Sequence, residues 1–296
     1  MSIIVRDAGM ERIVSAEAEV VQVATGFLFT EGALWHPREQ FLLFSDMPGD
    51  VIRRWDEKNG VQVFRRPSQM SNGLTYDRQG RLLACHHATS SVTRTEADGT
   101  ITTLATHYGG RALNSPNDIV VKSDGSIYFS DPSFGRMEFY GVPREQELDF
   151  RGVFRLGPDG ELTLLADDFS QPNGLCFSLD EQLLYVNDTE RGHIRVFDVM
   201  ADGTMGNGRL FASTRGDEPG APDGMKIDSQ GNLYSCGPGG IHVFAPGGEW
   251  LGVIRIPEVC ANFTWGGPAL QTLFVTASTS LYAVEVRVPG RAVFQA

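Results

Sequence analysis

The sequence predicts an all-β protein, a six-bladed β-propeller closed by a strand from its N-terminal region. Three observations support this fold class. Turn residues are abundant, with 34 Gly and 15 Pro among 296 residues and no collagen-like period. No long stretch has the apolar period of 3.6 residues that an amphipathic helix needs. A unit of two apolar runs around a polar turn recurs six times along the chain.

The repeated unit has the size of one four-stranded propeller blade. Successive copies begin about 40 to 56 residues apart, as expected for such blades. The six copies are EGALWHPREQFLLFSD from Glu31, NGLTYDRQGRLLACHH from Asn72, NDIVVKSDGSIYFSD from Asn117, NGLCFSLDEQLLYVND from Asn173, DGMKIDSQGNLYSCG from Asp223 and NFTWGGPALQTLFVTAS from Asn262. An irregular β-sandwich is the alternative fold, but a sandwich gives no reason for a residue-level repeat at this period.

Each copy also predicts how its blade is built. The polar turn carries Asp or Ser followed by Gly, Glu or Gln, as in Asp124-Gly125, and such residues favour tight hairpins. Two further runs follow each hairpin, for example residues 91–96 and 100–106 in the second copy. These runs supply the two outer strands of the blade.

The last copy lacks one strand. Residues 281–286 give it a third strand, and almost no chain follows. The alternating run at residues 18–25 precedes the first copy and is otherwise unassigned. We expect this run to complete the last blade, because that would close the ring and remove exposed sheet edges. Residues 1–296 then form one propeller domain, with a short N-terminal extension at about residues 1–17.

Charge and targeting signals narrow the classes of partner. The formal net charge is −12 at pH 7, whereas nucleic-acid binding needs clustered Lys and Arg, so no nucleic-acid partner is expected. The chain has no secretory signal and no window of about 18 apolar residues, which predicts a cytoplasmic protein without a membrane partner. We expect a monomer or a small homo-oligomer. The cysteines lack CxxC spacing and are expected to be free, buried thiols: Cys85, Cys176, Cys236 and Cys260.

Equivalent positions of the inner strands should form a ring around the central channel. The first repeat position holds Glu31, Asn72, Asn117, Asn173, Asp223 and Asn262. Two carboxylates in a partly desolvated channel repel each other, and a cation would relieve that repulsion. Oxygen donors suit one divalent metal ion, calcium first, with magnesium, manganese or zinc as the other candidates. The alternative is turn chemistry at each strand entry, which does not account for Glu31 or for Asn at four positions.

Five segments resemble those of a known family. They are TEGALWHP (30–37), LNSPNDIVVKSDGSIYFSDPSFG (113–135), QPNGLCFS (171–178), PDGMKID (222–228) and NFTWGGPALQTLFVTA (262–277). Together they are similar to the senescence marker protein, gluconolactonase and luciferin-regenerating family, most of all to its bacterial gluconolactonase branch, over about residues 20–288. The resemblance implies that Glu31, Asn173 and Asp223 are metal ligands and that Asn117 contacts metal or substrate.

The chain departs from that family at two places that bear on substrate choice. Related sequences often carry a Glu-His pair and an Arg pair where this chain reads CHHATSS at residues 85–91. A substrate-binding Arg of animal members is Ser115 here. The resemblance therefore implies the chemistry more strongly than it implies the substrate.

The expected reaction is hydrolysis of a small sugar-type lactone. A divalent ion on the ring would polarise the carbonyl and activate water. Asp223 is the expected general base, with Asp118 or Asp131 as competitors, because a carboxylate that binds a cation is a weaker base. No Gly-x-Ser-x-Gly motif points to a covalent route. Two alternatives stay open: hydrolysis of organophosphorus esters at the same metal site, and a non-catalytic calcium-binding or scaffold propeller.

Side chains near the channel mouth are expected to select the substrate. Discrimination among polyhydroxy lactones needs hydrogen-bonding partners for ring hydroxyls. The expected substrate contacts are Asn117, Asn114, His87 and Asp131. The insertion at residues 133–150 lengthens a loop of the third blade and is expected to fold over the mouth as a lid.

Overall fold

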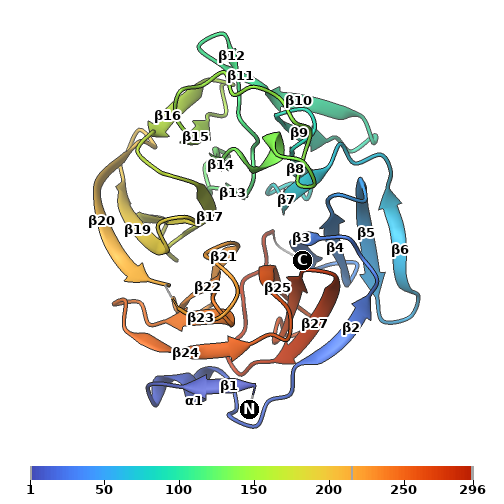
Figure 1. Ribbon diagram of the computed structural model, residues 1–296, viewed down its shortest axis with the longest axis vertical. Coiled ribbons are helices and arrows are strands. Elements are labelled where there is room, and N and C mark those ends of the chain that lie inside the picture. The colour runs from blue at the N-terminus through green and yellow to red at the C-terminus, as the bar shows by residue number, and fades with distance from the viewer. Residues whose placement is uncertain (1, 215, 295–296) are drawn as a thin grey trace.

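The computed structural model describes residues 2–214 and 216–294, in which six antiparallel sheets form a ring around a central axis (Figure 1). This arrangement confirms the predicted six-bladed β-propeller. Blade one contains β3 (Thr30–His36), β4 (Phe41–Asp46), β5 (Val51–Asp56) and β6 (Gly60–Arg65). Blade two contains β7 (Ser71–Tyr76), β8 (Leu82–His86), β9 (Ser91–Thr95) and β10 (Ile101–Ala105).

The next two blades follow the same order from the axis outwards. Blade three contains β13 (Ile119–Val121), β14 (Ile127–Asp131), β15 (Gly152–Leu156) and β16 (Leu162–Ala166). Blade four contains β17 (Pro172–Phe177), β18 (Leu183–Asp188), β19 (His193–Val199) and β20 (Met205–Ser213). A small hairpin, β11 (His107–Tyr108) and β12 (Arg111–Ala112), joins blades two and three and was not expected from the repeat.

The N-terminal region closes the ring as predicted. Blade six contains β25 (Cys260–Gly266), β26 (Thr272–Ala277) and β27 (Ser280–Glu285), and its outer strand is β2 (Val21–Thr25). Strand β2 pairs antiparallel with β27, with Val21 opposite Ala283 and Thr25 opposite Ser280. The last blade thus joins the two ends of the ring through backbone hydrogen bonds, which leaves no missing outer strand.

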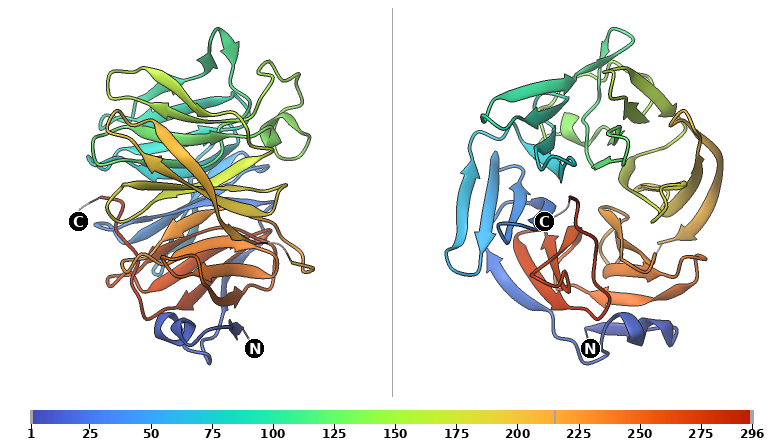
Figure 2. Two further views of the ribbon diagram at one scale, coloured as in Figure 1. Left: turned by 90° about the vertical axis from the view of Figure 1, so that its left-hand side faces the viewer. Right: turned by 180° about the vertical axis from the view of Figure 1, so that it is seen from behind.

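Blade five has one strand more than the repeat predicts. It contains β21 (Met225–Ile227), β22 (Leu233–Gly237), β23 (Gly240–Phe244) and β24 (Trp250–Arg255), and β1 (Ile3–Val5) pairs with β24 as a fifth strand. The helix α1 (Gly9–Ile13) follows and buries Met10, Ile13 and Val14 against this side of the molecule. The N-terminal extension is therefore a packed part of the fold, visible beside β24 in Figures 1 and 2. Its apolar Ile-Ile-Val run covers an outer strand edge that would otherwise be exposed.

The hydrophobic core lies between neighbouring blades. Leu34 and Leu43 of blade one, for example, form a cluster with Leu74 and Leu82 of blade two. Strands near the axis are buried on both faces, as β4 is at every position, whereas the outer strand β6 keeps exposed residues. Apolar contact on both faces of each blade explains why the inner repeats read as continuous apolar runs.

The C-terminal end and the cysteines complete the description. The last described residue, Phe294, is buried, and its ring packs against Tyr76 and His36. Figure 2 shows the C-terminal segment of the described chain running back over the inner strands. All four cysteines are free and buried, as expected, and Cys236 Sγ lies 2.7 Å from Cys260 Sγ. Among the residues described, no helix has the length and apolar character to span a membrane.

Candidate active site at the channel ring

The six residues of the predicted ring lie where the inner strands begin, and the backbone is irregular there. In four blades the pairing of the inner strand shifts register at this place, for example between Glu31 and Leu34 and between Pro172 and Leu175. In blades three and five the regular strand starts only two residues later, at Ile119 and Met225. A break in the ladder re-aims a side chain, here toward the axis.

Glycines let neighbouring ring positions approach one another closely. Gly32, Gly73 and Gly174 each follow a ring residue, and a Cβ on any of them would overlap the carbonyl oxygen of the next ring residue. A Cβ on Gly224 would overlap the Asn262 side chain. The Asn-Gly and Asp-Gly pairs of the repeat thus serve ring packing, and the turn-chemistry alternative does not describe them.

Replacing Gly174 by alanine is expected to displace the Asp223 backbone and to lower any activity of the ring by more than about tenfold, since a small misplacement of a site residue is costly. Gly206→Ala is the matched control, because its Cβ would meet only the flexible end of Met200. Both variants are compared by steady-state turnover and by circular dichroism. Equal activity of the two variants would contradict the packing argument.

Glu31 and Asp223 form a close carboxyl pair. Glu31 is buried, and its Oε2 accepts hydrogen bonds from the Gly32 amide at 2.8 Å and from Asn262 Nδ2 at 3.1 Å. Burial raises the pKa of Glu31 to about 7, and the Asp118 carboxylate adds to that rise. Burial and the Glu31 carboxylate raise the pKa of Asp223 well above its usual range. Both shifts show that negative charge at the ring is destabilised by the fold alone.

The two amide residues of the site, Asn173 and Asn117, differ in their contacts. Asn173 donates its Nδ2 to Thr189 Oγ1 at 3.1 Å, and Thr189 donates to the Pro222 carbonyl at 2.8 Å. That donation leaves the Asn173 Oδ1 as the group available to a ligand. The Asn117 backbone is held by Gly73 and Ser130, while its side chain makes no hydrogen bond to any residue that the structure describes.

These residues fit a divalent cation. Asp223 Oδ1 and Asn72 Oδ1 are buried and have no hydrogen-bond partner within the described residues. Orphaned buried oxygens next to a repelling carboxyl pair are what a hard cation compensates. The described residues contain no cluster of three His, Cys, Asp or Glu arranged for a metal, because the ring combines two carboxylates with amides. The ligand set Glu31, Asn173 and Asp223 stays a prediction.

His87 reaches the ring through Asn72. It is fully buried, its Nε2 lies 3.1 Å from Asn72 Nδ2, and its Nδ1 lies 2.8 Å from the Tyr140 carbonyl. Burial lowers the pKa of His87 to about 4, so its imidazole is neutral. The imidazole carries its proton on Nδ1, because a carbonyl can only accept a hydrogen bond. The adjacent His86 bonds to Ser68 and Thr93 inside blade two and does not reach the ring.

Hydrogen bonds join Asn114 and Asp131 to each other and to neighbouring backbone groups, and neither side chain is open to the channel. Asp131 accepts the backbone amides of Asn114 and Ser115, both at 2.8 Å, and Asn114 Nδ2 donates to the Asp131 and Phe150 carbonyls. Both residues are fully buried, and burial raises the pKa of Asp131 to about 7. The structure thus brings Glu31, Asn117, Asn173 and Asp223 to the ring but places these two side chains in its wall.

The repeat contains an Asp equivalent to Asp131 in two other blades. The last residue of the second strand is Asp in blades one, three and four, as Asp46, Asp131 and Asp188. Asp46 accepts the Leu28 amide at 3.0 Å, and Asp188 accepts the Ser170 amide at 2.7 Å. In each blade the carboxylate therefore anchors the loop that leads into the ring residue.

Asp118 and Lys226 are charged neighbours of the ring. Asp118 Oδ2 is buried without a partner among the described residues, and burial raises its pKa while Lys226 opposes the rise. Lys226 Nζ lies 3.2 Å from Asn262 Oδ1. Sequence reasoning named Asp118 as a competing base but missed Lys226. The repeat could have identified Lys226, because it is the only charged residue that stands three positions after a ring residue in any of the six copies.

The insertion at residues 133–150 crosses blade two toward blade one. Arg144 donates to the His87 carbonyl at 2.7 Å, and the Tyr140 ring packs edge-on against Phe29 with centroids 5.3 Å apart. The short 3-10 helix η1 (Phe134–Arg136) is anchored by Arg136, which donates to the Asn114 and Leu113 carbonyls. Phe139 on this segment stays half exposed. The segment thus lies on the face at which the ring residues enter, where a lid is expected.

A family model confirms the resemblance inferred from the motifs. Residues 29–279 match the SMP-30/Gluconolactonase/LRE-like region. The chain belongs to this family. The match includes every residue of the ring and the insertion over it.

The chain is similar to lactonases over most of its length. The chain is 32% identical to a gluconolactonase of Zymomonas mobilis, covering 95% of this chain and 85% of the relative. It is 28% identical to a pentonolactonase of Haloferax volcanii, with coverage of 86% and 84%. A solved structure of a gluconolactonase from Xanthomonas campestris is 36% identical, with a TM-score of 0.88 over 96% of this chain and 94% of that one.

Proposed function

We propose that this protein is a metal-dependent hydrolase that opens a small sugar-type lactone at the channel ring. The observation that carries the proposal is the buried Glu31 and Asp223 pair, which the fold assembles at a cost in charge repulsion. Similarity to a gluconolactonase and a pentonolactonase, both over most of the chain, supports the lactone as substrate class.

In this proposal Glu31, Asn173 and Asp223 hold one divalent cation, with calcium the first candidate because the donors are oxygens. A divalent cation bound there supplies Lewis-acid catalysis, polarising the lactone carbonyl and lowering the pKa of water. The protein's own task is to orient the substrate and to accept a proton. Asp223 Oδ1 is the candidate acceptor, and the orphaned Oδ2 of Asp118 is the competitor.

For the other residues of the wall we propose positioning roles. His87 holds Asn72 on one side and the Tyr140 carbonyl of the inserted segment on the other. Asn114 and Asp131 fix the loop that leads to Asn117. Specificity would then depend on Asn117 and on the inserted segment, whose placement these contacts decide.

Turnover measurements with a panel of substrates and metals test the proposed function. Hydrolysis of a sugar lactone that EDTA abolishes and calcium restores is the expected result. Faster turnover of a phosphotriester than of any lactone would replace the proposed substrate class. Absence of turnover on lactones, aryl esters and phosphotriesters with every metal would identify a binding protein instead.

Asn117→Ala is expected to lower kcat/KM for a hydroxylated lactone about 5- to 150-fold more than for a plain aliphatic lactone. The side chain has no partner within the described residues, so a substrate hydroxyl is the group it can serve, and one or two lost hydrogen bonds are worth about 1 to 3 kcal/mol. Gluconolactone and δ-valerolactone are the paired substrates. Equal losses on both would place Asn117 among the metal ligands instead.

A further inference from the structure

A second cavity occupies the channel on the side of the ring away from the inserted segment. It has a volume of about 520 Å³, within the range of small-molecule sites. All six residues three positions after a ring residue line it: Leu34, Thr75, Val120, Cys176, Lys226 and Trp265. Because a strand rises about 3.3 Å per residue, this cavity lies roughly 10 Å along the axis from the ring.

The cavity is strongly positive in a protein of net charge −12. Four cationic side chains line it, Arg38, Arg78, Lys226 and Arg291, against one carboxylate, Glu181. That carboxylate is already engaged, since it accepts the Ser123 amide at 3.0 Å and lies 3.7 Å from Lys122 Nζ. The excess positive charge is therefore not balanced by the lining itself.

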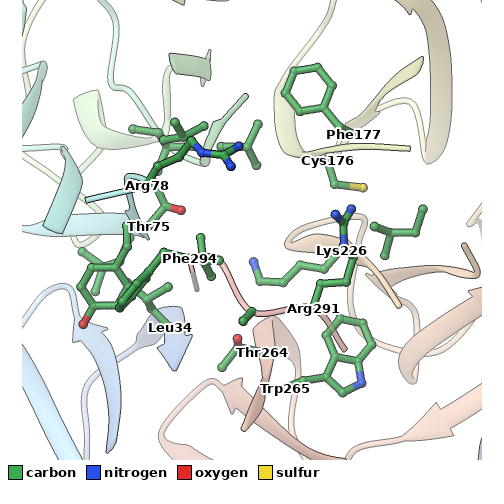
Figure 3. Close-up of a pocket in the computed structure, with 18 of the residues that line it drawn as sticks. Leu34, Thr75, Arg78, Cys176, Phe177, Lys226, Thr264, Trp265, Arg291 and Phe294 are labelled. Atoms are coloured by element: carbon green, nitrogen blue, oxygen red, sulfur yellow. The ribbon is translucent and has the colours of Figure 1, made fainter. Parts of the chain in front are cut away.

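Two of the four cations, Arg78 and Arg291, form no ion pair within the described residues, and Arg78 contacts the Ser123 carbonyl at 3.5 Å. Lys226 bonds to Asn262 Oδ1 and has the Asp118 carboxylate beside the ring as its charged neighbour. Figure 3 shows the three side chains entering the cavity from blades two and five and from the C-terminal segment. Like charges that share a recess repel one another, and an anion that bridges them removes the repulsion.

The remaining walls combine apolar and aromatic side chains with the hydroxyl groups of Thr75, Ser178 and Thr264. Leu34, Trp265 and Phe294 line the same space, and Phe294 is fixed by its contacts with Tyr76 and His36. An apolar wall with a few charged groups that converge is the usual composition of a small-molecule site. Arginine guanidinium groups match phosphate oxygens with two parallel hydrogen bonds.

We propose that this cavity binds a small phosphomonoester dianion with an apolar or aromatic body. Arg78, Lys226 and Arg291 would contact the phosphate, and Trp265 and Phe294 would pack on the body. The site is separate from the proposed lactone site and does not depend on it. Because Lys226 also contacts Asn262 of the ring, it would link an occupied cavity to the ring.

Calorimetric titration with phenyl phosphate tests the proposal, with phenol and benzoate as matched probes. The expected result is binding of phenyl phosphate that weakens as NaCl is raised, with weaker binding of benzoate and none of phenol. The double variant R78Q/R291Q should bind phenyl phosphate at least about tenfold more weakly. Lactone turnover and circular dichroism serve as its folding controls, because neither arginine lies at the ring.

The double variant R12Q/R209Q is the matched control, since it removes two positive charges from exposed sites outside the cavity. It should bind phenyl phosphate as the parent protein does. Equal weakening in both double variants would assign the binding to overall charge and overturn the proposal. Unchanged binding in R78Q/R291Q, benzoate binding as tight as that of phenyl phosphate, or no binding up to about 10 mM would also overturn it.

Discussion

Replacing Asp223 by asparagine is expected to lower kcat/KM for a sugar lactone by at least about 10³-fold, or about 4 kcal/mol of transition-state stabilisation. The substitution keeps the size of the side chain and removes one of two charges that would hold the cation. It also removes the candidate proton acceptor, whose Oδ1 is buried without a partner in the described part of the chain. Steady-state kinetics and calorimetric titration with calcium measure the two losses separately.

Glu31→Gln is the informative comparison, because it weakens the same cation site but leaves Asp223 in place. We expect saturating calcium to restore part of the activity of Glu31→Gln and none of the activity of Asp223→Asn. Asp198→Asn, on the third strand of blade four, is the neutral control, because the Asp198 side chain is partly exposed and pairs with Arg209 away from the ring. If Asp223→Asn recovers at high calcium while Asp118→Asn does not, the base is Asp118.

In metal-free protein the Glu31 carboxyl is expected to oppose folding increasingly as the pH rises from about 5 to 8, so the stability of the parent protein relative to Glu31→Gln should fall over this range, and calcium should reverse much of that relative loss. The buried His86 and His87, whose pKa values are lowered to about 4, raise the stability of both proteins over the same range. The fold raises the pKa of Glu31 from 4.5 to about 7, so the folded state favours the protonated carboxyl. A raised pKa contributes stability that is full below the unfolded value and is lost as pH passes the folded value. For Glu31 alone the loss amounts to roughly 3 kcal/mol.

Urea denaturation at pH 5 and pH 8, with EDTA or with calcium, measures this effect. Asp131 also has a pKa raised to about 7, so it too contributes a loss of stability as the pH rises. Both of its oxygens accept backbone amides away from the ring, so calcium should not reverse the loss that Asp131 causes. Glu31→Gln should lack the Glu31 contribution to the pH dependence of the metal-free protein, and Asp131→Asn should lack the Asp131 contribution, which calcium does not reverse. An identical pH dependence of stability in the metal-free parent protein and in metal-free Glu31→Gln would refute the description of the carboxyl pair.

Local pattern explains why so much of the architecture is visible in the sequence. Each blade is a run of hairpins, so its strands are neighbours in the chain and its turn residues mark its limits. The last copy lacks one strand, so its blade needed a strand from elsewhere in the chain. Residues 18–25 were the one alternating run that no other blade used. The structure pairs Val21–Thr25 with β27 accordingly.

Long-range packing explains what the sequence did not reveal. Nothing in the Ile-Ile-Val run at residues 3–5 indicates that it pairs with β24, because any uncovered strand edge could accept it. The substrate-contact roles of Asn114 and His87 stay predictions. In the structure Asn114 Nδ2 donates to the Phe150 carbonyl and His87 Nε2 lies 3.1 Å from Asn72 Nδ2, contacts that depend on the loops packed around them.

The sequence by itself determined the blade count, the closing strand and the six polar residues of the ring, because a repeat of fixed period places equivalent residues at equivalent heights around one axis. Tertiary structure alone decided which polar groups are left without partners and how charge is distributed along the channel. The carboxyl pair of Glu31 and Asp223 and the unbalanced cations of the second cavity arise between blades far apart in the chain. Burial and Coulomb interactions depend on those distances in space, which no local pattern encodes.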